Sequence, residues 1–176
     1  GTPEFAAAPL EALLNQGYKV VGVVTVADKP SGRGQKVNES AVKKCAAAHG
    51  IPVLQPDRLK DPEFLSRLKA MKADIFIVVA FRMLPQEVWS MPKLGTFNLH
   101  ASLLPQYRGA APINWALING EGRTGVTTFM IDKKIDTGGI ILRQSLIIGE
   151  NDTAGDVHDA LMEMGAEMVV TTAQGL

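Results

Sequence analysis

The stretch TFNLHASLLP, residues 96–105, joins a short strand pattern to a loop rich in proline and glycine. Asn98 and His100 stand two positions apart, so on a strand their side chains point to the same face, about 7 Å apart along it. The upstream run FIVVA, residues 76–80, is too short for a helix and rich in branched side chains, which predicts a buried strand. A carboxamide and an imidazole therefore meet at the C-terminal end of a strand, where open α/β sheets bind ligands.

The rest of the chain alternates between helical and strand patterns. Further strands are predicted over residues 18–26, 51–54, 74–80, 125–132 and 139–148. Helices are predicted over residues 3–16, 39–49, 61–71, 85–91, 112–119 and 153–173. This order predicts an α/β fold with a mainly parallel, doubly wound sheet and an antiparallel hairpin near the C-terminal end. Residues 28–37 show no periodicity and are predicted to form a loop.

The composition is that of one globular domain with a sizeable core. The 176 residues are 46% hydrophobic and 20% charged, and the formal net charge is zero. A nucleic-acid partner would therefore need a local basic patch. A single cysteine, Cys45, excludes an internal disulfide, and three scattered histidines give no zinc-ligand spacing, so we expect no metal. No run approaches 18 apolar residues, from which we expect a cytoplasmic protein with no membrane partner.

Asp136 lies in the turn between the last two predicted strands and can reach His100 only through the fold. A buried carboxylate hydrogen-bonded to the imidazole would fix its tautomer and raise its pKa. Asn98 could stabilise the oxyanion of an acyl transfer. No serine or cysteine elbow accompanies this trio, which favours direct attack by the substrate's own nucleophile. The alternative is that His100 is a structural loop histidine and Asp136 a turn residue.

Three segments are candidate binding surfaces. The apolar loop 102–105 suits a flat heteroaromatic ligand, and residues 81–85 could form the opposite wall. The loop 29–36 combines glycines with cations, including Arg33 and Lys36, and could contact phosphates. The alternatives are that residues 102–105 form a tight loop packed on the core and that residues 29–36 form a solvated mobile loop.

Taken together, these motifs resemble the formyltransferase family that uses 10-formyltetrahydrofolate, over essentially the whole chain. The matching segments are residues 1–6, 29–36, 98–112 and 136–138. The resemblance implies a Rossmann-like fold in which Asn98, His100 and Asp136 are catalytic, and it leaves open which of them removes the amine proton. It implies a folate site formed by Ser102, Leu103, Leu104, Pro105, Arg82, Met83 and Leu84.

The resemblance also implies an acceptor. A formyl group would pass from 10-formyltetrahydrofolate to the α-amine of methionyl initiator tRNA, whose end would contact Arg33 and Lys36, and the protein would act as a monomer. Family members begin with a strand before the Gly-Thr-Pro turn and carry a C-terminal β-barrel. We therefore expect residues 1–176 to form the catalytic domain without either element, with an unpaired gap near the middle of the sheet.

Rival interpretations remain. A sugar-nucleotide N-formyltransferase shares the trio but has no need of the basic loop. A purine-pathway formyltransferase should open with a Gly-Ser or Gly-Asn turn in place of Gly-Thr-Pro. From a different class, a non-catalytic nucleotide-binding module would have no use for an acyl-transfer trio.

Overall fold

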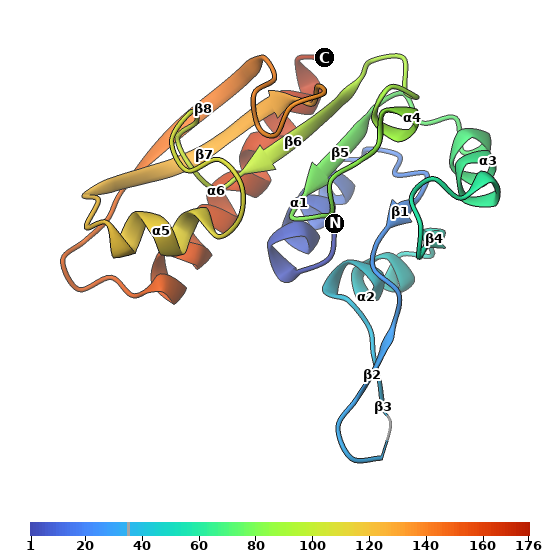
Figure 1. Ribbon diagram of the computed structural model, residues 1–176, viewed down its shortest axis with the longest axis horizontal. Helices are drawn as coiled ribbons and strands as arrows, with labels where there is room; N and C mark the ends of the chain where they lie inside the picture. The colour runs from blue at the N-terminus through green and yellow to red at the C-terminus, as the bar shows by residue number, and fades with distance from the viewer. Residues whose placement is uncertain (35) are drawn as a thin grey trace.

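The computed structural model describes residues 1–34 and 36–176, and Figure 1 shows the arrangement of their helices and strands. The helices are α1 (Glu4–Asn15), α2 (Ala41–Ala48), α3 (Pro62–Ala70), α4 (Gln86–Trp89), α5 (Pro112–Ile118) and α6 (Ala154–Gln174). The strands are β1 (Val23–Val24), β2 (Lys29–Ser31), β3 (Lys36–Asn38), β4 (Val53–Leu54), β5 (Phe76–Val79), β6 (Thr96–His100), β7 (Arg123–Met130) and β8 (Ile140–Ile147). Among the described residues, no helix is both long and apolar enough to cross a membrane.

The main sheet has the strand order β5-β6-β7-β8. Strands β5 and β6 are parallel, and β6, β7 and β8 follow one another antiparallel. Strands β1 and β4 form a second parallel pair. The predicted α/β class, with parallel strands and an antiparallel hairpin near the C-terminal end, is confirmed. In this register Asn98 lies opposite Val78 on β5, and His100 lies opposite Thr127 on β7.

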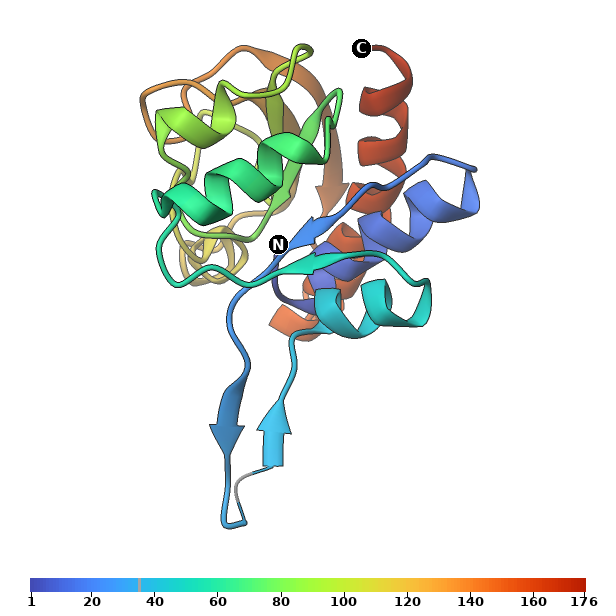
Figure 2. The same cartoon turned by 90° about the vertical axis from the view of Figure 1, so that its right-hand side faces the viewer.

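Helices cover both faces of the main sheet. Figure 2 shows α1 and α6 on one side of the strands, with α3 and α4 on the other. The larger core joins β6 and β7 to α1 and α6, and includes Phe97, Leu99 and Leu161, each at most 3% exposed. A Cβ atom on Gly165 of α6 would lie 2.8 Å from the Leu99 side chain, so glycine at this position allows α6 to approach β6 closely. This packing fixes the strand that carries Asn98 and His100.

The β1 region differs from its prediction, since only Val23–Val24 of the expected strand 18–26 is a strand. In the described part of the chain, β1 pairs with β4 and β5 pairs with β6, but β1 and β5 do not pair with each other. A cavity of about 770 Å³ adjoins both strands, lined by apolar side chains such as those of Val23 and Ile77. Because no described strand pairs with β1 on the side that faces β5, the valine-rich residues 18–26 are mostly half-buried and form few strand hydrogen bonds.

The prediction of an irregular loop over residues 28–37 is wrong, because β2 and β3 form an antiparallel hairpin there. Lys29 pairs with Asn38 and Ser31 pairs with Lys36. The hairpin projects from the rest of the molecule, and its described residues are exposed (Figure 1, Figure 2). With both faces in solvent, nothing requires apolar and polar residues to alternate, so the sequence carries no strand periodicity.

Candidate active site

The C-terminal ends of β5 and β6 open into a cleft of about 1250 Å³. Asn98 and His100 of β6 both line it, as their spacing predicts. Asp136, from the segment between β7 and β8, joins them there. Two polar side chains of one strand and a third that is distant in the sequence therefore share one cleft, at the sheet edge where α/β folds bind ligands.

His100 is held by a backbone carbonyl. The residue is 9% exposed, and its Nε2 lies 2.7 Å from the carbonyl oxygen of Tyr107. A carbonyl only accepts hydrogen bonds, so Nε2 carries the proton of the neutral ring and Nδ1 presents a lone pair. Nδ1 lies 3.7 Å from Oδ2 of Asp136, too far for a hydrogen bond. The expectation that Asp136 fixes the tautomer is therefore wrong, because Tyr107 does so.

Asp136 is turned toward the imidazole by a different contact. Its Oδ2 accepts a hydrogen bond of 2.8 Å from the backbone N–H of Gly109. Gly109 has φ +85°, a left-handed conformation that glycine adopts without strain. The side chains of His100 and Asp136 are 11% and 13% exposed. In this arrangement two acceptors, the Nδ1 lone pair and the carboxylate, face each other across 3.7 Å, which suits a hydrogen-bond donor that contacts both.

Left-handed backbone gathers around the cleft. Ala80, Ala111 and Asp136 line the cleft with φ values of +47°, +53° and +52°. Tyr107, whose carbonyl holds His100, has φ +56°. Non-glycine residues in this region cost free energy and cluster at functional sites. Their concentration here supports the assignment of the cleft as the active site.

The Tyr107 side chain anchors this loop to the turn that follows α5. Its hydroxyl donates to Oε1 of Glu121 at 2.7 Å and accepts from Nδ2 of Asn119 at 3.1 Å. The hydrogen bond from Asn119 lowers the pKa of the phenol, but the hydrogen bond to Glu121, burial and the Glu121 charge together raise it above its ordinary value. The phenol therefore remains a donor at neutral pH. Sequence reasoning missed Tyr107 because its role falls to its backbone oxygen, which every residue type carries.

The predicted folate loop lies behind the cleft rather than along it, since Ser102, Leu103, Leu104 and Pro105 are not among its lining residues. The hydroxyl of Thr127 donates to Ser102 O at 2.6 Å and accepts from Leu104 N at 3.2 Å. Arg143 Nη1 donates to Leu104 O at 3.0 Å. These backbone groups are occupied within the protein, so the loop supports the site from behind. The supporting roles of Thr127 and Arg143 could not be predicted, because the sequence indicates only that both residues lie on strands.

The opposite wall lines the cleft as predicted, through Arg82, Met83 and Leu84. The Arg82 guanidinium donates to Asp57 O at 3.0 Å and to Pro56 O at 2.8 Å. Its charge is therefore directed at the loop after β4, and it ties that loop to the wall. Met83 is 66% exposed, an apolar side chain free to contact a ligand.

The predicted phosphate-contacting residues lie apart from the trio. Arg33, at the turn of the hairpin, and Lys36, on β3, are both exposed and do not line the cleft. The hairpin nevertheless begins at the cleft rim, because Val26 lines the cleft and β2 starts at Lys29. Across residues 1–34 and 36–176, no three histidine, cysteine or acidic side chains converge as metal ligands would.

Comparison with known proteins gives a family match over nearly the whole chain. Residues 1–173 match the family described as "Formyl transferase". The chain is 59% identical to a methionyl-tRNA formyltransferase of Azobacteroides pseudotrichonymphae genomovar. CFP2, over all of this chain and 55% of that protein. It is 61% identical to a protein of the same name from Parabacteroides distasonis, over 98% of this chain and 53% of that protein. The chain therefore spans about half the length of the curated relatives it matches.

Solved structures share the fold at low sequence identity. Phosphoribosylglycinamide formyltransferase from Streptococcus pneumoniae TIGR4 superposes with a TM-score of 0.80 at 16% identity, covering 99% of this chain and 94% of that one. WlaRD, a sugar 3N-formyl transferase, superposes with a TM-score of 0.72 at 24% identity, covering 99% of this chain and 60% of that one. The match over 173 residues and the shared fold lead to one assignment: this chain belongs to the formyl transferase family.

Proposed function

We propose that this chain is the catalytic part of an enzyme that transfers a formyl group from 10-formyltetrahydrofolate to the α-amine of methionyl initiator tRNA. The observation that carries the proposal is the largely enclosed His100–Asp136 pair beside Asn98 in one cleft. The relatives named methionyl-tRNA formyltransferase, at about 60% identity, support this acceptor over the other amines. That the protein is a monomer and lies in the cytoplasm stays a prediction.

The cleft has the size that two substrates need. Pockets for one small molecule enclose roughly 300–1,000 Å³, and this cleft encloses about 1250 Å³. We propose that the flat ring of the donor lies against the wall of Arg82, Met83 and Leu84. The loop Ser102–Pro105 would then act from behind, by keeping the end of β6 and its two polar side chains in place.

The reaction begins when the amine nitrogen attacks the formyl carbon. The formyl oxygen of the tetrahedral intermediate becomes negatively charged, and the Asn98 carboxamide donates an N–H toward it. The bond between the formyl carbon and N10 of the folate then breaks. N10 takes up one proton and the amine loses one, so that the products are a formylated amine and tetrahydrofolate.

The tautomer of His100 supports one route for that proton. Because Nε2–H is committed to Tyr107 O, the free lone pair on Nδ1 is the group that can accept the amine proton. The imidazolium so formed faces the Asp136 carboxylate, which stabilises its positive charge. His100 then returns the proton to N10 as the general acid. Asp136 is held in place throughout by the N–H of Gly109.

The exposed hairpin supplies the contact for the tRNA. The chain has no net charge, so a polyanion must be held by local cations. Arg33 and Lys36 meet this need on a projection that starts at the cleft rim. We propose that they contact phosphates near the aminoacylated end.

The test offers competing acceptors to the full-length gene product. It is incubated with 10-formyltetrahydrofolate and either methionyl initiator tRNA, an amino-sugar nucleotide or glycinamide ribonucleotide, and the formylated product is identified by mass. We expect formylation of the methionyl-tRNA alone. A methionyl-tRNA whose amine is already acetylated is the control and should give no product. Formylation of only the sugar or the glycinamide would overturn the proposal.

A further inference from the structure

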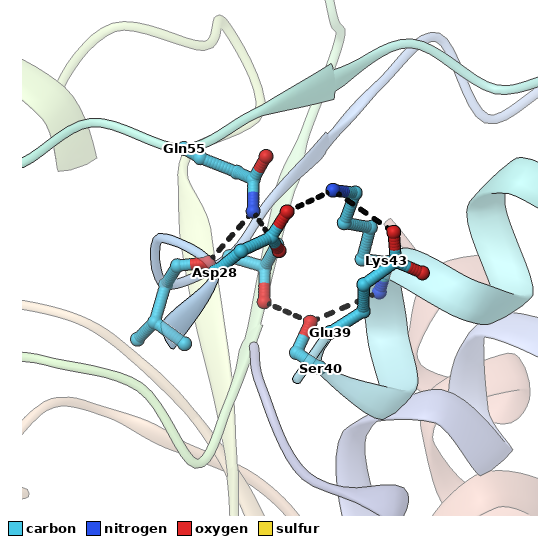
Figure 3. A network of polar contacts seen from close by, with 7 residues as sticks. Asp28, Glu39, Ser40, Lys43 and Gln55 are labelled. Carbon is cyan, nitrogen blue, oxygen red and sulfur yellow. Dashed lines mark hydrogen bonds and ion pairs between the residues drawn. The ribbon is translucent and has the colours of Figure 1, made fainter. Parts of the chain in front are cut away.

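A cluster of polar side chains lies where the β2–β3 hairpin joins the body of the protein. We name it the Lys43 cluster, and Figure 3 shows its labelled side chains converging from three parts of the chain. Its members are Asp28, Glu39, Ser40, Lys43 and Gln55. None of them lines the cleft, so the formyl-transfer chemistry leaves them without a role.

Lys43, on α2, ties the two legs of the hairpin together. Its ammonium forms an ion pair and hydrogen bond with Oδ2 of Asp28, the residue directly before β2. It also lies 3.3 Å from Oε1 of Glu39, the residue directly after β3. One positive charge on the body therefore contacts both the entry and the exit of the hairpin.

Gln55, which follows β4, holds the entering leg from the other side. Its Nε2 donates to Oδ1 of Asp28 at 2.8 Å and to the carbonyl of Val26 at 3.0 Å. Val26 lines the cleft, so the same amide contacts both the cleft rim and the hairpin leg.

Hydroxyl groups complete the connection on the exit side. The Thr25 and Ser40 hydroxyl oxygens lie 2.6 Å apart, within hydrogen-bonding distance. Ser40 also caps α2, since its Oγ accepts from the backbone N–H of Lys43 at 3.0 Å. Thr25 is fully buried, so this contact joins the exit leg to the interior.

The cluster keeps its charges at neutral pH. The hydrogen bond from Lys43, followed by that from Gln55, lowers the pKa of Asp28, and the hydrogen bond to Asp28 raises the pKa of Lys43. The Lys43 and Asp28 side chains are 21% and 25% exposed, more enclosed than a freely solvated surface pair. Such a pair orders its surroundings better than one between fully exposed side chains.

We infer that the Lys43 cluster is a positioning device that fixes the direction in which the hairpin leaves the cleft rim. An isolated two-stranded hairpin is marginally stable, so the orientation of this exposed one depends on its attachment. A fixed direction keeps Arg33 and Lys36 where a tRNA entering the cleft would meet them. Because the hairpin is already ordered, it loses less conformational freedom when the tRNA binds. The inference rests on the proposed function, which supplies the polyanion.

The test compares substitutions on one helix in the full-length gene product. Lys43→Gln and Asp28→Asn break the ion pair, and Lys44→Gln, which removes an exposed charge from the next position of α2, is the matched control. We expect the first two to raise the KM for methionyl-tRNA about three- to tenfold. The KM for the folate donor and kcat should stay within about twofold, and Lys43→Arg should restore the tRNA KM because arginine can also bridge two carboxylates.

Other outcomes overturn the inference. If Lys43→Gln behaves like Lys44→Gln, the cluster does not position the hairpin. If kcat and both KM values worsen together with a lower Tm, its role is general stability. A Lys43→Arg protein that stays as impaired as Lys43→Gln would likewise exclude positioning by charge pairing.

A direct binding measurement separates this inference from the proposed function. Fluorescence anisotropy with labelled tRNA is recorded for the wild type, Lys43→Gln and the double variant Arg33→Ala/Lys36→Ala. If Lys43→Gln weakens binding although no tRNA is formylated, the proposed function fails and the inference stands. If only the double variant weakens binding, the inference fails while the proposed function stands.

Discussion

The cleft at the end of β6 and the β2–β3 hairpin are held in place by different means. In the cleft, His100 is nearly buried and bound to a backbone carbonyl, and interior groups such as Thr127 support the loop behind it. In the hairpin, the described residues are exposed, and charged side chains secure the base through Lys43. The cleft is therefore held by buried contacts with the core, whereas the hairpin is attached to the body of the protein by ion pairs at its base.

This difference matches what the proposed function requires of each region. Formyl transfer requires reacting groups held to about 0.5 Å, which buried backbone contacts and close packing supply. Contact with an RNA backbone depends on charge and reach, so an exposed arm with a defined direction suffices. A change in the cleft should therefore alter the chemical step, and a change in the hairpin should alter acceptor binding.

Replacing His100 with alanine is the strongest test of the cleft. If His100 accepts the amine proton, as proposed, its loss should lower kcat about 10²–10⁴-fold. The tRNA KM should change little, since the hairpin is untouched. Single-turnover formylation measures the effect. His49→Ala, which removes an exposed histidine at the end of α2, serves as the control and should be near wild type. Near-wild-type turnover of His100→Ala would remove that residue from the mechanism.

The double variant Arg33→Ala/Lys36→Ala is the corresponding test of the hairpin. Each lost phosphate contact reduces the slope of log K against log salt by about 0.7–0.9, so two contacts should reduce it by about 1.4–1.8. Affinity for tRNA at low salt should fall about ten- to a hundredfold, with an unchanged kcat at saturating tRNA. Anisotropy titrations at several salt concentrations measure both quantities. An unchanged salt slope would show that these cations do not contact the RNA.

More of the cleft than of the hairpin could be predicted from the sequence. A spacing of two places Asn98 and His100 on one face wherever a strand forms, and the buried strands around them show apolar runs. Asp136 was a candidate partner from its turn between two predicted strands, but only the resemblance to a family implied that it lies beside them. The Tyr107 carbonyl and the Thr127 hydroxyl were not predictable, because neither role requires a distinctive residue pattern. The hairpin was missed since it has no buried face to impose a period.

Thr127→Val tests the support behind the cleft. Valine has nearly the same shape but leaves Ser102 O and Leu104 N unpaired in the interior, at a cost of about 1–3 kcal/mol in the free energy of unfolding. We expect kcat to fall about three- to tenfold as the end of β6 loosens. Thr128→Val is the matched control, because Thr128 is equally buried but bonds the Thr172 hydroxyl at 2.9 Å.

Both variants should show a similar loss of stability in thermal melts, and only Thr127→Val should lose activity. If Thr128→Val lost as much activity, the rate would follow overall stability rather than the position of the loop.

The smallest effect concerns the pH dependence of the hairpin's attachment. The pKa of Asp28 lies below its ordinary value of 3.8, so its stabilising contribution is complete above that value and is lost as pH falls through the lowered pKa. The pKa of Lys43 lies above its ordinary value of 10.5, so its contribution is complete below that value and is lost as pH rises through the raised pKa.

Between about pH 5 and pH 9 the attachment should therefore be constant. The measurement is the ratio of the tRNA KM of Lys43→Gln to that of the wild type across this range, and we expect a flat ratio. Any pH dependence of kcat in the same range would then originate in the cleft, which separates the two regions without a further substitution. A ratio that changed more than about twofold would mean that another titrating group sets the direction of the hairpin.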